Sequence, residues 1–279
     1  MMLPVVLAAA PITIQFTVTN TGAQDGLWIM RPWIGIHDGA FQMYTVGQAA
    51  PPGVQHEAED GVTGDTTATT LLSGPPNACT GVAAVYSVAA PCQYSIFAAY
   101  HGGSQQASIG GPTSPGATLV KQFTVDPADP KSQFLSYMVM IIPSNDAFFG
   151  TDSAHPIQLF DNKGNFNGGR GIITQRIEFN DILDAGTEVN TESHADTAFF
   201  GQSTNGTGTH PDTNSVIHKH GPFGSAITTG SNMYPGSQWN FFDKANHQGP
   251  VAEVKICVVG ATDRTACAAP GHEFGFGHH

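Results

Sequence analysis

The chain has 279 residues, which is long enough for one large domain to bury its own core. Its formal net charge is −12, with 10 Lys+Arg against 22 Asp+Glu, so its surface repels phosphates and argues against a nucleic-acid partner. Charged residues make up only 11% of the chain, while 33 Gly and 19 Pro supply many turns. This composition is typical of secreted proteins built from short strands.

The first ten residues are apolar and end in three alanines, as the hydrophobic region and cleavage site of a secretory signal peptide do. We therefore expect residues 1–10 to be the remnant of a signal peptide, although no basic region precedes them. A short buried strand is the alternative. Residues 11–260 are expected to form the domain, and 261–279 a tail with no core pattern. No other stretch approaches the ~18 apolar residues of a spanning helix, so we expect no integral membrane segment.

Five segments have the apolar pattern of strands, and they lie at residues 12–19, 119–126, 134–142, 172–179 and 251–259. The first alternates without a fault, with Ile12, Ile14, Phe16 and Val18 on one face. Residues 134–142 are almost continuously apolar, which indicates a central strand covered on both faces. Residues 85–88 and 94–100 are weaker strand candidates. Many short strands with few helical signals predict an all-β fold, an antiparallel β-sandwich with long loops, with a closed barrel as the alternative.

Two regions carry little strand pattern. Residues 53–74 contain an acidic cluster, Glu57, Glu59 and Asp60, in a stretch that could form one or two short turns. Residues 187–238 are rich in Gly, Asn, Ser and His, and loops of this length in a compact domain are usually functional or mobile. The sequence does not assign a role to residues 190–245.

The four cysteines, Cys79, Cys92, Cys257 and Cys267, support an oxidising compartment and a secreted or cell-surface location. Of the three pairings, we prefer the two local disulfides, 79–92 and 257–267. No Cys-x-x-Cys spacing occurs, which makes a cysteine metal site the weaker interpretation.

Three acidic segments follow apolar stretches, at His37-Asp38, residues 143–150 and Asp184-Ala-Gly-Thr-Glu188. Carboxylates gathered at strand ends can hold a hard cation such as Ca²⁺. The residues by themselves favour a second interpretation, in which Asp146 and Asp184 are turn-forming residues that accept hydrogen bonds from local backbone.

Seven pieces in order give the chain a resemblance to a known family: residues 12–18, 36–47, 58–61, 140–150, 184–188, 216–220 and 249–256. Together they resemble the spondin N-terminal domain in its bacterial exported form. The resemblance implies an extracellular β-sandwich similar to calcium-dependent lipid-binding sandwiches. It implies Ca²⁺ at one end, held by Asp146, Asp184 and Glu188, the last being Glu where animal relatives carry Asp. It also implies a binding or structural module at the cell surface or in the extracellular matrix, with an unidentified partner there.

Two other functions compete with this one. His218 and His220 would lie on one face of a strand, a spacing that suits copper or zinc, and His37 and His101 form a looser set with Trp33. For His37, a buried hydrogen-bonding role is preferred. Alternatively, exposed edge strands and the tail would allow self-assembly into a homo-oligomeric extracellular filament or layer. No catalytic motif occurs and the acidic cluster at residues 57–60 fits a solvated turn, so we expect no enzyme.

Overall fold

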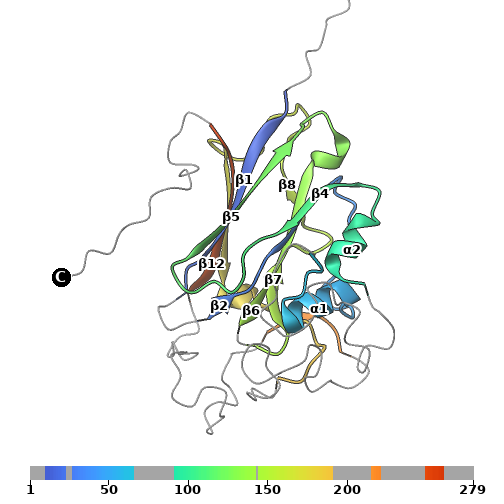
Figure 1. Cartoon of the computed structure of the whole chain (residues 1–279), viewed down its shortest axis with the longest axis vertical. Helices are drawn as coiled ribbons and strands as arrows, with labels where there is room; N and C mark the ends of the chain where they lie inside the picture. The colour runs from blue at the N-terminus through green and yellow to red at the C-terminus, as the bar shows by residue number, and fades with distance from the viewer. Residues whose placement is uncertain are drawn as a thin grey trace, which may run out of the picture.

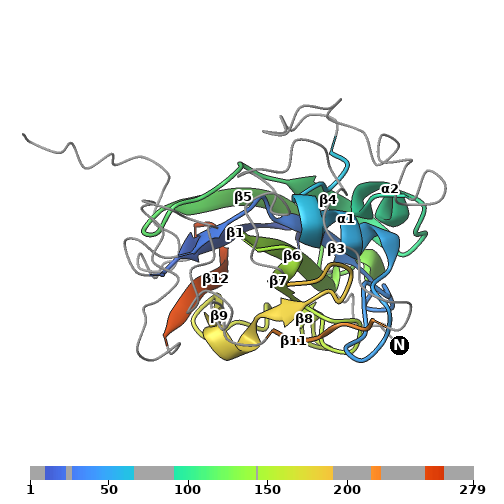
Figure 2. The ribbon, with the colours of Figure 1, turned by 90° about the horizontal axis from the view of Figure 1, so that it is seen from below.

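The computed structural model describes residues 10–22, 27–65, 91–142, 144–190, 215–220 and 249–260. In this part of the chain two antiparallel β-sheets pack face to face, as Figures 1 and 2 show from two directions. Two short helices lie beyond the larger sheet, on the side away from the smaller one. The predicted all-β sandwich is therefore confirmed, and the closed barrel is not the architecture.

The smaller sheet has four strands in the order β5-β1-β12-β9. Their bounds are Thr118–Val125 for β5, Ile12–Asn20 for β1, Pro250–Val258 for β12 and Ile172–Glu178 for β9. Apolar and polar residues alternate along β1, so its apolar side faces inward. Ile14, Phe16 and Val18 on that side are fully buried. Ile12, predicted on the same face, is only partly buried at the strand's start.

The larger sheet follows the order β11-β10-β7-β6-β3-β4, and two further strands, β2 and β8, also pair with β6. Its bounds are Trp28–Ile29 (β2), Trp33–His37 (β3), Gly103–Ser108 (β4), Phe134–Ile142 (β6), Ala147–Gly150 (β7), Ile157–Gln158 (β8), Leu183–Asp184 (β10) and His218–Lys219 (β11). The pairings within both sheets are antiparallel. Strand β10 is thus held between β7 and β11, far along the chain from both neighbours.

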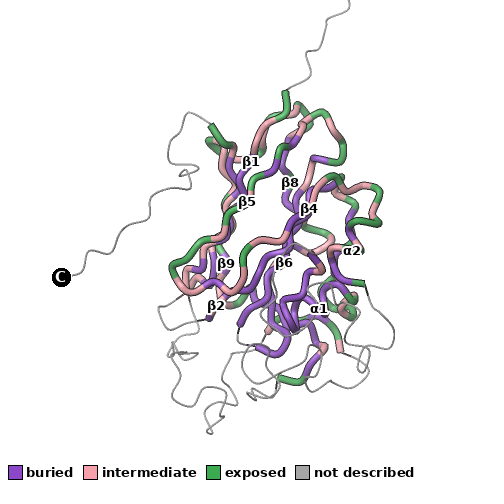
Figure 3. Tube along the Cα trace, viewed as in Figure 1, coloured by how far each residue is buried: buried purple, intermediate pink, exposed green. Residues whose placement is uncertain are grey.

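Strand β6 is covered on both faces, as its continuous apolar sequence predicts (Figure 3). Leu135, Tyr137 and Val139 face the smaller sheet and join the main core. Met138 faces the other way, into a second cluster that also contains Phe148 of β7 and residues of the helices. The larger sheet therefore separates a core inside the sandwich from an outer layer that covers its far face.

The helices of that outer layer are α1 (Pro52–Asp60) and α2 (Gln93–Ala98), and two single turns, η1 (Pro130–Ser132) and η2 (Phe179–Asp181), complete the described elements. Helix α1 begins with proline in its first turn and ends at Gly61, whose φ of 62° is the left-handed conformation that glycine adopts readily. Val54 and Ala58, one turn apart, pack into the outer cluster. Helix α1 therefore packs on β6 and β7 through the side that carries Val54 and Ala58.

The five principal strands predicted from sequence are observed within one or two residues of their predicted bounds. The prediction of a strand at residues 94–100 is wrong, because most of this segment is helix α2, whose first turn is closed by the Ile96 amide bonding to the Cys92 carbonyl. Residues 85–88 lie outside the described part. Within the described ranges, no helix is long and apolar enough to cross a membrane.

Candidate functional site

Asp146 lies in the turn between β6 and β7, and its side chain is fully buried. Its Oδ2 accepts hydrogen bonds from the Thr187 amide at 2.7 Å, from the Thr187 hydroxyl at 3.1 Å and from the Glu188 amide at 3.0 Å. Its other oxygen, Oδ1, is buried and has no hydrogen-bond partner. A buried carboxylate oxygen without a partner is costly, so this atom marks a place that a ligand could fill.

The loop after β10 brings the other two predicted ligands to Asp146. The Ala185 amide donates to the Asp146 carbonyl at 3.1 Å, and Asp184 Oδ1 accepts from the Gly186 amide at 2.7 Å. Gly186 has a φ of +68°, a conformation that turns the chain sharply and aims the next two amides at Asp146. The turn at residues 184–188 therefore lies against Asp146, and binding of an ion by Asp146, Asp184 and Glu188 stays a prediction.

Helix α1 adds two carboxylates that the sequence analysis did not place at the site. Glu59 is fully buried and Asp60 is 2% exposed, so the expectation of a solvated acidic turn was wrong. Glu59 Oε1 accepts a hydrogen bond from Gln55 Nε2 at 2.9 Å, while Oε2 is buried without a partner. Both carboxylates lie in the last turn of the helix, where the helix dipole is unfavourable to negative charge. We call Glu59, Asp60, Asp146, Asp184 and Glu188 the buried carboxylate group.

The members of this group perturb one another electrostatically. Burial, together with the negative charge of Asp184, raises the pKa of Asp146 to about 7, while the hydrogen bonds from Thr187 and Glu188 act in the opposite direction. Burial, and then the neighbouring charge of Asp60, raise the pKa of Glu59 well above its usual range. Asp146 also contributes to the shift of Glu59, which places the two carboxyls in one electrostatic unit. Negative charge here is therefore undercompensated by the surrounding protein.

An imidazole approaches the group from the neighbouring strand, where His218 Nε2 lies 3.8 Å from Asp184 Oδ2. The His218 side chain is 57% exposed, so solvent screens this interaction. The charge of Arg31 acts on Glu57 and Asp65, which are not members of this group. Within the described ranges no three His, Cys, Asp or Glu side chains form a ready metal-binding set. A cation would therefore have to draw the carboxylates into a different arrangement from the one observed.

Of the histidines that the structure describes, the four singled out from the sequence do not come together in one site. His37 is buried on β3, where its Nδ1 accepts from the Gly39 amide at 3.0 Å and its Nε2 lies 3.0 Å from the Ser136 hydroxyl. Burial lowers the pKa of His37 to about 4, so the ring is neutral and both nitrogens are engaged. This is the structural role preferred for it from the sequence. His101 is exposed in a turn, and His218 and His220 lie on or beside β11, several strands away from β3. A transition-metal site at His218 and His220 stays a prediction.

The two described cysteines lie in different layers. Cys92 caps α2 and Cys257 belongs to β12, and neither is a free thiol. Because α2 covers the larger sheet and β12 lies in the smaller one, these two cysteines are not each other's partners. Cys79 and Cys267 lie outside the described residues, so the preferred pairing stays a prediction.

Comparison of the sequence with models of known protein families finds no match, and a search of curated proteins finds none either. The function must therefore be argued from the residues themselves. In the described structure, the buried carboxylate group combines buried carboxylate oxygens that lack hydrogen-bond partners with raised pKa values.

Proposed function

We propose that this protein is an exported, calcium-binding β-sandwich of the spondin type that acts as a binding or structural module at the cell surface or in the extracellular matrix. The calcium ion would be bound by the buried carboxylate group. Asp146 and Glu59 would supply the first ligands, and Asp184, Glu188 and Asp60 would add oxygens from the same region.

One observation carries this proposal. Asp146 Oδ1 and Glu59 Oε2 are both buried, both lack a hydrogen-bond partner, and each carboxyl raises the electrostatic cost of ionising its neighbours. A fold that buries several carboxylates stabilises them either by protonation or by a bound cation. At neutral pH in a calcium-rich extracellular medium, a cation is the more effective compensation.

The chemistry of the ligands favours calcium over softer metals. All five side chains offer carboxylate oxygens, and the turn at residues 184–188 adds backbone carbonyls. Calcium takes six to eight such oxygens and tolerates irregular geometry, whereas Mg²⁺ requires a near-ideal octahedron. Copper and zinc prefer imidazole and thiolate ligands. The imidazole of His218, 3.8 Å from Asp184, has a side chain that is 57% exposed.

Calcium at this place would fix loops and would not perform catalysis. The carboxylates come from three segments that are distant in sequence, namely the end of α1, the turn before β7 and the loop after β10. One ion shared among them would fasten the outer helix to two neighbouring strands. Loops held in place on a rigid sandwich in this way commonly carry binding residues.

Thermal unfolding in calcium and in chelator tests the proposal. If calcium binds the folded chain, a concentration of about 100 times Kd adds about 2.7 kcal/mol to the free energy of unfolding, and magnesium adds much less. For a chain of this size the gain corresponds to a rise in Tm of about 5–10 °C. Equal Tm values in calcium, magnesium and chelator would reject the calcium function.

A further inference from the structure

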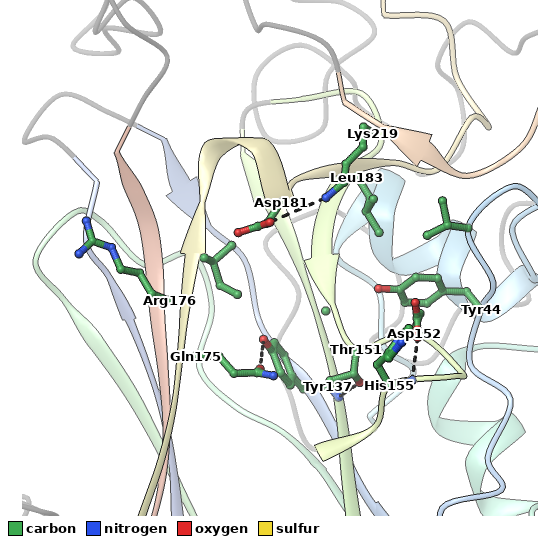
Figure 4. Close-up of a pocket in the computed structure, with 13 residues that line it drawn as sticks. Tyr44, Tyr137, Thr151, Asp152, His155, Gln175, Arg176, Asp181, Leu183 and Lys219 are labelled. Carbon is green, nitrogen blue, oxygen red and sulfur yellow. Dashed lines mark hydrogen bonds and ion pairs between the residues drawn. The ribbon is translucent and has the colours of Figure 1, made fainter. Parts of the chain in front are cut away.

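A second concave site, separate from the buried carboxylate group, lies between β9, the edge strand of the smaller sheet, and strands of the larger sheet. It has a volume of about 490 Å³ and is lined by residues of β6, β7, β9, β10 and β11, with loop residues that follow β3 and β7. Figure 4 shows the side chains that surround it. We call it the edge pocket. A volume of this size is within the range of small-molecule sites.

Tyr44 provides the most informative group in the edge pocket. Its side chain is 3% exposed, and its hydroxyl points into the space between Leu183 and Tyr137 (Figure 4). Its ring packs edge-on against Phe148, which fixes the direction of the hydroxyl. Among the described residues no group forms a hydrogen bond with this hydroxyl. Burial raises its pKa well above the usual value, so it keeps its proton and remains a donor.

Tyr137 and Gln175 form a second polar pair in the pocket. The Tyr137 hydroxyl donates to Gln175 Oε1 at 2.9 Å, which orients the amide and leaves its Nε2 as a donor. The ring of Tyr137 is fixed in turn by Phe16 and Phe149. The pocket therefore presents neutral hydrogen-bonding groups on two rigid aromatic side chains. Ile177 and Leu183 add an apolar surface beside them.

The charged residues at the pocket have partners of their own within the protein. Asp181 lies 3.8 Å from Lys219, and Asp152 Oδ1 is 2.8 Å from His155 Nδ1 (Figure 4). Arg176 likewise pairs with Glu178, its neighbour along β9. No single sign of charge dominates the lining, so the pocket has no electrostatic reason to select an anion or a cation.

We propose that the edge pocket binds an uncharged sugar unit, as a monosaccharide or as one residue of a longer glycan. A sugar ring has an apolar C–H face and a rim of hydroxyls, each of which can both donate and accept. The tyrosine rings, Ile177 and Leu183 can pack against the apolar face of the sugar. The Tyr44 hydroxyl and the Gln175 amide can form hydrogen bonds with its hydroxyls. The open side of the pocket would let a longer glycan continue into solvent. This inference does not depend on the calcium site.

Saturation-transfer NMR on the full chain tests the assignment with cellobiose, lactose and maltose as neutral probes and glucuronic acid and glutamate as charged ones. We expect saturation transfer to the C–H protons of at least one neutral disaccharide and none to the charged probes. Tyr44→Phe removes one hydroxyl and should weaken that binding roughly three- to tenfold, the effect of one hydrogen bond. Gln175→Leu should weaken it to a similar degree.

Tyr100→Phe is the matched control, because Tyr100 bonds to Asp38 away from the pocket and its loss should leave sugar binding unchanged. Near-ultraviolet circular dichroism confirms that each variant is folded, and Gln175→Leu serves as the test if Tyr44→Phe is not. Absence of transfer to all three disaccharides would overturn the inference. Preference for a charged probe would also overturn it, as would binding that survives both pocket substitutions.

Discussion

Asp146 and Thr187, 41 residues apart in the chain, are joined by two hydrogen bonds to the same carboxylate oxygen. The Thr187 amide and hydroxyl both donate to Asp146 Oδ2, which ties the turn before β7 to the loop after β10. This arrangement uses one oxygen of Asp146 for structure and leaves Oδ1 buried without a partner. The same residue thus closes a loop and contributes to the proposed calcium site.

Asp146→Asn should raise Tm in chelator but reduce the rise in Tm that calcium causes. In chelator, the amide can still accept from Thr187 and removes a buried charge, so Tm at pH 8 should rise by a few degrees, at about 2–4 °C per kcal/mol. In calcium, the variant should show little of the stabilisation found for the wild type. Differential scanning calorimetry in both buffers measures the two effects.

Asp126→Asn is the control for this substitution, because Asp126 accepts from the Ala128 amide in an exposed turn remote from the group. It should leave the calcium-dependent change in Tm intact. A calcium effect of wild-type size in Asp146→Asn would contradict the assignment of Asp146 as a ligand.

Glu59→Gln and Glu57→Gln separate two buried glutamates that lie two residues apart on α1. Glu59 interacts with Asp60 and Asp146, whereas Glu57 Oε1 accepts from the Trp33 amide at 3.2 Å and lies near Arg31. Calcium affinity, followed by isothermal titration, should fall at least about tenfold for Glu59→Gln, the loss of one charged ligand. It should stay within about twofold for Glu57→Gln. Equal losses in both variants would point to damage of the helix and not to lost ligation.

The pH dependence of stability should reveal the raised pKa of Asp146. The folded pKa, about 7, lies above the unfolded value of 3.8, so the folded state holds the proton more tightly. The resulting stability is complete below the unfolded pKa and is lost as the pH rises through about 7. In chelator, the wild-type Tm should therefore fall between about pH 5 and pH 8 more steeply than that of Asp146→Asn.

His37 acts with the opposite sign and must be separated from this effect. Its folded pKa of about 4 lies below the usual 6.5, so its contribution to stability is present above 6.5 and is lost as the pH falls toward 4. The contribution of His37 to stability cancels when wild type and Asp146→Asn are compared, since His37 is present in both proteins. Parallel pH profiles of the two proteins would count against a perturbed Asp146.

Gly186→Ala tests whether the turn after β10 aims the amides of Thr187 and Glu188. A Cβ at this φ of +68° is strained and would lie 2.5 Å from the Val216 carbonyl oxygen. The left-handed conformation alone costs about 1–2 kcal/mol, and the close contact adds to that. Gly116→Ala is the control, because its φ is +85° and no atom lies within 4 Å of its added Cβ. Urea unfolding should show a clearly larger loss for Gly186→Ala, and equal losses would refute a packed turn.

The strands were predictable from sequence where they were long and regular. Strands β1 and β6 were both predicted correctly. The alternating sequence of β1 indicates a strand with one buried face, and the continuously apolar sequence of β6 indicates a strand buried on both faces. Strands β3 and β7 were missed, since five and four residues give too little periodicity to recognise. The segment that forms α2 was misassigned because its aromatic and β-branched residues suit a strand, while local backbone bonds and packing on β3 and β4 make it helical.

The site was only partly predictable, and for different reasons. Asp146, Asp184 and Glu188 were proposed from a family resemblance, because their local pattern by itself favours ordinary turns. Glu59 was overlooked because acidic clusters usually face solvent, and its burial arises from tertiary packing of α1 on β6 and β7. A useful signal was present all the same. Proline at residue 52 and glycine at residue 61 delimit a nine-residue helix whose apolar Val54 and Ala58 draw its end against the sheet.

Calorimetric titration of chelator-treated protein with CaCl₂ at pH 7.5 measures calcium binding itself. We expect saturable binding of one calcium ion per folded chain, with no comparable heat from MgCl₂ and none from calcium added to Asp146→Asn. No saturable heat in the wild type, together with an unchanged Tm, would contradict the calcium function.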